Sequence, residues 1–276
     1  MRWGDYKIPP GRGFGGLVGR VRLDVVDAVY IEDIYMQNQP VPTRVKAIVN
    51  VRNTSPKVAV RTVGYTVTPK NVSDKVVARG SRKLYLEPGD NSVELEIDVP
   101  DARLWDIDSP ELYQCDVTLS DGKRPVDSDR RTFGFRWFSP DGIGEEAVLR
   151  LNGRRVMLRS AISWGYWPAT GLHARPDMAR KQIAVAKSMG LNMLNFHRSI
   201  GSPVVLEQAD SMGILYYEEP GAIHSADHDP FIRAIVNTKL KRMVKRDRSH
   251  PSLVIYNLIN ELGGVRAADT ALMAKR

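Results

Sequence analysis

The sequence contains a single cysteine, Cys115, which excludes an intrachain disulfide but does not fix the compartment. Because Cys115 lies among alternating apolar residues, we expect a small buried side chain rather than a reactive thiol. No run of about eighteen apolar residues occurs, and the first five residues lack the apolar core of a signal peptide. We therefore expect neither a membrane-spanning helix nor a membrane partner.

The chain has fewer acidic than basic residues: 32 Asp and Glu against 40 Lys and Arg, which gives a net charge of +8. Apolar Ile232, Val236, Leu240 and Met243 recur at helical spacing through the most basic stretch, which predicts an amphipathic helix with a basic solvent face. No aromatic residues interleave there to stack on bases, so we expect no nucleic-acid partner. The basic residues of this stretch are Lys239, Lys241, Arg242, Lys245, Arg246 and Arg248.

The first half of the chain has the two-residue period of β-strands. Apolar residues alternate with polar ones from Val45 to Val51 and again from Val93 to Val99. Turn residues such as Pro-Gly and Asp-Gly separate the strands, and this pattern is typical of an immunoglobulin-like sandwich, here over residues 27–138. Further strands are expected near residues 29–35, 58–67, 76–84, 112–119 and 128–135.

After residue 150, strand-like and helical segments alternate as in βαβ units. One helix is expected to begin with a cap at Asp177, to bury Ala179, Ile183, Ala186 and Met189, and to end at Gly190. Four such steps are half of an eight-stranded (β/α)8 TIM barrel of about 250 residues, and a four-stranded doubly wound sheet is the alternative. The expected strands are 156–162, 191–196, 214–217 and 253–258.

Polar and aromatic side chains follow each of these four strands, where parallel βα folds place their active sites. Glycosidases need a carboxylic acid to protonate the leaving oxygen and an opposed carboxylate, with aromatic rings against the sugar and polar groups for its hydroxyls. The strand ends supply such groups. They are Ser163, Trp164, Tyr166 and Trp167; His197, Arg198 and Ser199; Glu218 and Glu219; and Asn260 and Glu261.

Four segments, in this order, resemble motifs of glycoside hydrolase family 2. They are the Leu-Trp element with Ser-Pro-Glu at 104–113, Gly-Phe-Arg at 134–136, Leu-Asn-Gly-Arg at 151–154, and the stretch from His-Pro-Ser to Asn-Glu at 250–261. The resemblance implies hydrolysis of terminal β-glycosidic bonds by a retaining mechanism, with Glu261 as general acid/base. From the strand-end positions we expect Asn260, His197, Arg198, Glu219, Trp164 and Trp167 to bind the carbohydrate, with a substrate contact or a supporting role for Glu219. We expect no cofactor and no metal.

The resemblance further implies three domains. Residues 1–26 correspond to the end of a sugar-binding jelly roll, 27–138 to the immunoglobulin-like sandwich, and 139–276 to the first half of the TIM barrel. The family nucleophile closes the seventh barrel strand, and no residue here occupies that position. We therefore expect little or no turnover from this chain alone, and the exposed edges of half a barrel favour a homo-oligomer.

Two departures bear on substrate choice. The family commonly has Arg followed by Ser-His at the second strand end, where this chain has Asn195 and Arg198, and Ile259 replaces a Gly before Asn260. His197 and Arg198 could instead satisfy strand-end carbonyls, and the two tryptophans could be packing residues. A non-catalytic carbohydrate-binding or structural fragment is therefore the alternative function. Residues 224–229, rich in His and Asp, match no tight metal-ligand spacing and are expected to form a polar loop.

Overall fold

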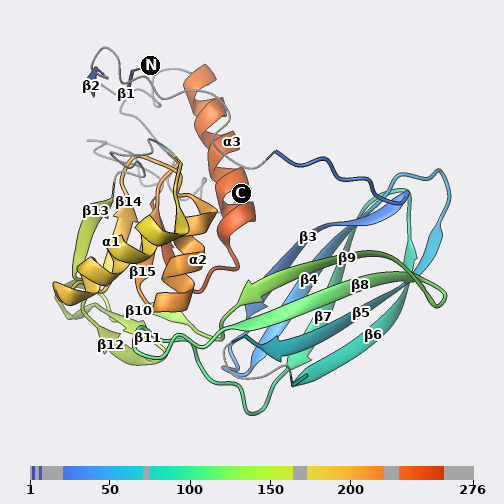
Figure 1. Cartoon of the computed structure of the whole chain (residues 1–276), viewed down its shortest axis with the longest axis horizontal. Coiled ribbons are helices and arrows are strands. Elements are labelled where there is room, and N and C mark those ends of the chain that lie inside the picture. The colour runs from blue at the N-terminus through green and yellow to red at the C-terminus, as the bar shows by residue number, and fades with distance from the viewer. Residues whose placement is uncertain are drawn as a thin grey trace. The chain divides into compact units, whose positions relative to one another are not determined.

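The computed structural model describes residues 2–3, 6–7, 21–70, 75–163, 173–220 and 230–257. The chain divides into two compact units (Figure 1). The antiparallel unit contains Leu23–Met157 together with the short segment Arg248–Pro251, and the parallel unit contains Leu158–Asp247 and the strand that follows Ser252. Two short strands near the N-terminus, β1 (Arg2–Trp3) and β2 (Tyr6–Lys7), pair with each other.

The antiparallel unit is built from two sheets of long strands. The first sheet has the order β3-β4-β7 and the second the order β6-β5-β8-β9, with antiparallel pairing throughout. The strands are β3 (Val29–Asn38), β4 (Arg44–Asn53), β5 (Ala59–Pro69), β6 (Ala78–Leu86), β7 (Gly89–Asp98), β8 (Tyr113–Asp121) and β9 (Arg124–Phe133).

Both sheets bury one face in a common core. Val45 and Val49 of β4 are fully buried, and so are Val63 of β5 and Val117 of β8, which is the consequence of the two-residue alternation. Cys115 belongs to the same core, where burial raises the pKa of its thiol to about 12. The expectation of a small buried side chain at Cys115 is confirmed.

A smaller sheet follows, with the order β10-β11-β12, and completes the antiparallel unit. Its strands are β10 (Phe138–Asp141), β11 (Val148–Leu151) and β12 (Arg154–Val156), with a 3-10 turn at Gly144–Glu146. Asn152 and Gly153 connect β11 to β12 with φ of 52° and 78°. Two successive left-handed residues are the requirement of the tight hairpin turn that Asn-Gly favours.

The parallel unit holds four described strands in the order β13-β14-β15-β16, and every pair is parallel. Helices separate the later strands along the chain, and Figure 1 shows α1 and α2 side by side over the sheet. The elements are β13 (Ser160–Ser163), α1 (Pro176–Ser188), β14 (Met193–Phe196), α2 (Pro203–Met212), β15 (Leu215–Glu218), α3 (Pro230–Asp247) and β16 (Leu253–Tyr256). No described helix is both long enough and apolar enough to cross a membrane.

Helix α1 confirms most of its predicted face and corrects its ends. Ala179, Ile183 and Ala186 are buried, but Met189 is 72% exposed because it follows the last helical residue and leaves the helical period. The predicted cap at Asp177 is wrong. The helix begins one residue earlier at Pro176, and the Asp177 carboxylate binds the Arg175 guanidinium instead.

Helix α3 confirms three positions of its buried stripe, Val236, Leu240 and Met243, while the side chain of Ile232 lies outside the described part of the chain. The assignment of Arg248 to its basic solvent face is wrong, since the helix ends at Asp247 and Arg248 belongs to the antiparallel unit. The strand expected over 156–162 is divided between β12 and β13, with residues 157–159 outside both.

Candidate functional site

The four parallel strands end in register. Ser163, Phe196, Glu218 and Tyr256 are successive partners across the sheet, so the residues after them form the row where parallel folds carry chemistry. Backbone hydrogen bonds continue beyond the strands, because the His197 amide donates to the Ser163 carbonyl at 3.1 Å and the Asn257 amide to the Glu218 carbonyl at 2.9 Å. The prediction that His197 and Glu219 lie at adjacent strand ends is confirmed.

Glu219 is the centre of this row, with 1% of its surface exposed. One carboxylate oxygen accepts the Arg198 backbone amide at 2.8 Å, and the other accepts the Asn257 side-chain amide at 3.1 Å. The His197 Nδ1 atom is 3.7 Å from that second oxygen. Three strand ends therefore meet on one carboxylate, which fixes their relative positions.

Arg198 adopts an unusual backbone conformation, with φ of 54° in the left-handed region that non-glycine residues rarely occupy. The Glu219 carboxylate binds the amide of this same residue, so the contact that holds Arg198 in place comes from the next strand end. Strained residues of this kind cluster at functional sites.

Asn195 and Tyr217 extend the site below the strand ends. The Asn195 side-chain amide donates to the Tyr217 hydroxyl at 2.6 Å, and Asn195 is almost fully buried. Burial and then the charge of Glu219 raise the pKa of Tyr217, so its phenol stays protonated. Asn195, at the position where the resemblance implies an arginine, has a neutral partner in Tyr217.

Glu218 lies in a separate cluster although it is the neighbour of Glu219. Successive strand residues point to opposite faces, and the Glu218 carboxylate accepts the Gly201 amide at 2.6 Å and lies 3.5 Å from the Arg246 guanidinium. Arg246 makes two hydrogen bonds with Asp247, at 2.7 and 2.6 Å. Glu218 is therefore held between the start of α2 and the end of α3.

This second cluster has more acid than base. Glu218 and Asp247 are both fully buried, and among the described residues Arg246 is the cation that lies against both carboxylates. Burial and the charge of Asp247 raise the pKa of Glu218 to about 9, against a smaller opposite effect of Arg246. One arginine cannot neutralise two buried carboxylates, so Glu218 carries a proton at neutral pH.

Sequence reasoning missed Asn257 and Tyr217 as members of the site. Asn257 was placed inside a strand predicted to reach residue 258, whereas β16 ends at Tyr256 and leaves Asn257 at the strand end. The position directly after each parallel strand was the available signal, since His197 and Glu219 occupy it too. Glu261, Asn260, Trp164, Trp167 and residues 224–229 lie outside the described residues.

Residues of the first three motifs contact one another in the antiparallel unit, where Pro251 represents the fourth motif. The Asn152 side chain donates to the Trp105 carbonyl at 2.9 Å and accepts the Trp137 amide at 3.2 Å. A Cβ atom added to Gly134 would lie 2.7 Å from the Trp105 Cβ and 3.0 Å from the Pro251 Cβ, which accounts for glycine there. These contacts between motif residues hold the antiparallel unit together and lie outside the row of parallel strand ends.

Comparison with known proteins identifies the class. The model for glycosyl hydrolases family 2 matches residues 29–136. A putative beta-glucuronidase of Formosa agariphila is 31% identical over 214 residues, which cover 74% of this chain and 20% of the relative. A beta-galactosidase of Thermoanaerobacterium thermosulfurigenes is 27% identical over 269 residues, which cover 92% of this chain and 36% of the relative.

Solved structures agree in fold. A glycosyl hydrolase family 2 member from Bacteroides cellulosilyticus superposes with a TM-score of 0.78 at 23% identity, over 87% of this chain and 32% of that chain. A beta-galacturonidase from Eisenbergiella tayi gives 0.75 at 20% identity, over 91% and 44%. The chain belongs to glycoside hydrolase family 2. It spans between a fifth (20%) and about a third (36%) of the two curated relatives named above.

Proposed function

We propose that this chain is part of an enzyme that hydrolyses terminal β-glycosidic bonds with retention of configuration. The observation that carries the proposal is the meeting of His197, Arg198 and Asn257 on the buried Glu219 carboxylate at the ends of parallel strands. A fixed polar array at this edge suits the recognition of sugar hydroxyls.

Glu261 is the general acid/base in this proposal. It follows Asn257 by four residues, directly after the strand end that contacts Glu219. In the first step Glu261 would protonate the leaving oxygen, and in the second it would deprotonate the water that releases the sugar. A retaining enzyme also needs a nucleophilic carboxylate about 5 Å away, and we assign none within these residues, so we expect little or no turnover from this chain alone.

The remaining candidates take binding roles. Asn260 would bond the sugar's 2-hydroxyl, Trp164 and Trp167 would pack against the ring, and the His197 and Arg198 side chains would bind hydroxyls or a carboxylate. Glu219 already accepts two hydrogen bonds, so its main role would be to hold its neighbours in position.

The proposal includes the architecture of the family. Residues 1–26 would be the end of a jelly roll, residues 27–138 an immunoglobulin-like sandwich, and residues 139–276 the first half of a TIM barrel. Two antiparallel sheets with a shared core and a four-stranded parallel sheet with intervening helices support this assignment.

Substitution Glu261→Gln in the complete enzyme tests the proposal. We expect kcat on an unactivated β-glycoside to fall by about 10²-fold or more, since a general acid contributes that much. Glu207→Gln, the same change at an exposed residue of α2, is the matched control and should leave kcat unchanged. Full activity of the Glu261→Gln enzyme would contradict the assignment.

A panel of substrates identifies the sugar. Relatives are named for glucuronides, galactosides and galacturonides, so matched aryl β-glycosides of these sugars form the panel. Binding of a sugar in calorimetry, without hydrolysis by the complete protein, would favour a non-catalytic carbohydrate-binding function instead.

A further inference from the structure

The connection between α3 and β16 is short, and its residues group with the antiparallel unit. Helix α3 ends at Asp247 and β16 begins at Leu253. The four residues Arg248–Pro251 group with the antiparallel strands, while the elements on both sides group with the parallel unit. Contacts made by these four residues therefore bear on where β16 starts.

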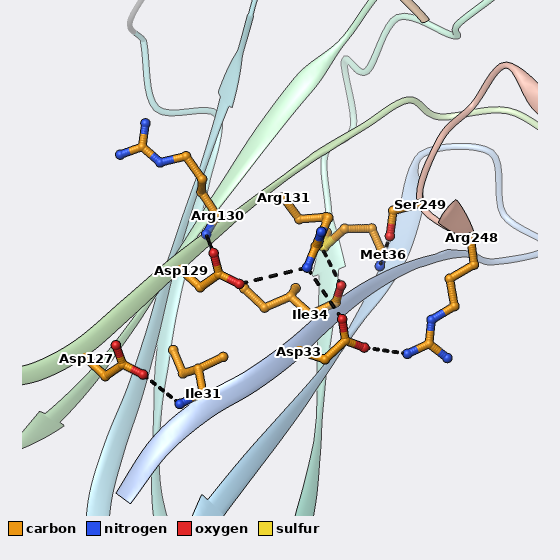
Figure 2. A network of polar contacts seen from close by, with 10 residues as sticks. All are labelled: Ile31, Asp33, Ile34, Met36, Asp127, Asp129, Arg130, Arg131, Arg248 and Ser249. Atoms are coloured by element: carbon orange, nitrogen blue, oxygen red, sulfur yellow. Dashed lines mark hydrogen bonds and ion pairs between the residues drawn. The ribbon is translucent and has the colours of Figure 1, made fainter. Parts of the chain in front are cut away.

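Arg248 makes the strongest of these contacts (Figure 2). Its Nη2 donates to the Asp33 carboxylate at 2.6 Å, and the guanidinium carbon lies 4.3 Å from the centroid of the Tyr35 ring. The Asp33 side chain is only 9% exposed. A charge-assisted hydrogen bond to a largely desolvated carboxylate, combined with a cation-π contact, fixes the arginine in two directions.

A β-bulge in β3 directs the Asp33 side chain toward the two arginines. The pairing of β3 with β4 shifts register between Ile31 and Asp33, so that Glu32 is an extra residue. A bulge of this kind redirects the following side chain. The second oxygen of Asp33 faces Arg131 of β9 at 3.4 Å, so the carboxylate joins an arginine of the antiparallel unit's own strands to Arg248.

The rest of the segment is held as well. The Met36 amide donates to the Ser249 hydroxyl at 3.3 Å, and the Arg136 Nε donates to the Pro251 carbonyl at 2.9 Å. A Cβ atom added to Gly134 would lie 3.0 Å from the Pro251 Cβ, so the backbone that follows β9 packs closely against Pro251. Both ends of the four-residue segment are thus bound before β16 begins.

We infer that Arg248 is a positioning residue, which through Asp33 holds the start of β16 and thereby the strand-end residue Asn257. On the proposed function, which the catalytic part of this inference requires, the same contact positions Glu261. The path is covalent, because only Ser252 and the four residues of β16 separate Pro251 from Asn257. A displacement at the start of a short strand is passed to its end.

Hydrogen exchange of the β16 amides, from residues 253 to 257, tests the inference in this chain. Arg248→Gln should speed exchange there about tenfold or more, because a charge-assisted hydrogen bond that closes the local structure is lost. Arg131→Gln cuts the other arm of the same network and should leave β16 exchange unchanged. Arg44→Gln, at an exposed ion pair with Asp98, controls for the loss of one positive charge.

Two outcomes would overturn the inference. Unchanged β16 exchange in Arg248→Gln would mean that the contact does not hold the strand, and an equal increase in Arg131→Gln would mean that the network only stabilises the antiparallel unit. Arg248→Lys keeps the charge but loses the planar fork, and it should restore part of the protection.

Activity of the complete enzyme separates this inference from the proposed function. A displaced general acid impairs alkyl glycosides, which need protonation, more than dinitrophenyl glycosides, which do not; Arg248→Gln should lower kcat for the former about tenfold more. Equal losses on both substrates would contradict positioning of the acid. If Glu261→Gln were fully active, the proposed function would fail, while the exchange result would still decide the role of Arg248 in β16.

Discussion

In the antiparallel unit one buried carboxylate, Asp33, meets two arginines, whereas in the parallel unit two buried carboxylates, Glu218 and Asp247, share one. The first arrangement links strands to the segment that precedes β16, and a more exposed second carboxylate, Asp129, also lies 3.8 Å from Arg131. The second has acid in excess and lies between a strand end and two helices. Both are buried networks in which every charge depends on its partners.

The difference shows how charge balance sets the response to pH. Where arginines bind a buried carboxylate, removal of the acid weakens the pairing of their charges. Where carboxylates outnumber the cation, a proton supplies the missing positive charge, and Glu218 takes it up. Replacement of the carboxylate by a neutral amide should therefore destabilise the Asp33 cluster and leave the Glu218 cluster intact.

Asp33→Asn should give the largest loss of stability. The change removes the carboxylate that Arg248 binds and leaves Arg131 with Asp129 at 3.8 Å and the Ile34 carbonyl. We expect the free energy of unfolding of the antiparallel unit to fall by about 2–3 kcal/mol. The arginines are partly exposed, which keeps the loss at the lower end of the range for buried pairs. Denaturant unfolding followed by Trp105 fluorescence measures it, and an unchanged midpoint would contradict the role of the network.

Glu218→Gln should instead change the pH dependence of the parallel unit. The folded pKa of Glu218, about 9, lies above its ordinary 4.5, so the folded state holds the extra proton and stability falls as pH rises between these values. Glutamine can still accept from Gly201 and donate to Asp247. We expect the variant to remove a slope that approaches about 1.4 kcal/mol per pH unit, the value for one full proton.

Hydrogen exchange of the β14 and β15 amides from pH 6 to pH 9, corrected for intrinsic rates, gives this slope for the parallel unit alone. Wild type and Glu218→Gln should diverge as pH rises, with the variant relatively more stable at pH 9. Parallel curves would mean that Glu218 is ionised across this range.

Arg44→Gln should have the smallest effect. Arg44 and Asp98 form a pair in which both side chains are about half exposed. Solvent screens such a pair, so we expect less than about 0.5 kcal/mol, measured by the same denaturant unfolding. A loss comparable to that of Asp33→Asn would remove the distinction between buried and exposed pairs.

Much of the fold was predictable from the spacing of apolar residues, which repeats every two residues in strands and every three to four in helices. The alternation around Val45 and Val93 placed β4 and β7, and the helical stripe of Ala179, Ile183 and Ala186 placed α1. Ends were less predictable, because Met189 and Asp177 fit the expected pattern but the helix begins at Pro176 and ends at Ser188. Helix ends depend on contacts that the period does not contain.

The candidate site was predictable in outline, since His197, Arg198 and Glu219 were expected at adjacent strand ends and are found there. Its partners were not, because Asn257 depends on where β16 stops. The link between Asp33 and Arg248 joins residues far apart in the sequence through a bulge at Glu32, and no local pattern announces it.

Azide rescue of the Glu261→Gln enzyme tests the central claim most directly. If Glu261 is the acid/base of a retaining glycosidase, azide needs no general base and should attack the glycosyl-enzyme, which restores turnover of an activated substrate and yields the β-glycosyl azide. An α-glycosyl azide, or an impaired enzyme that azide does not rescue, would contradict the account.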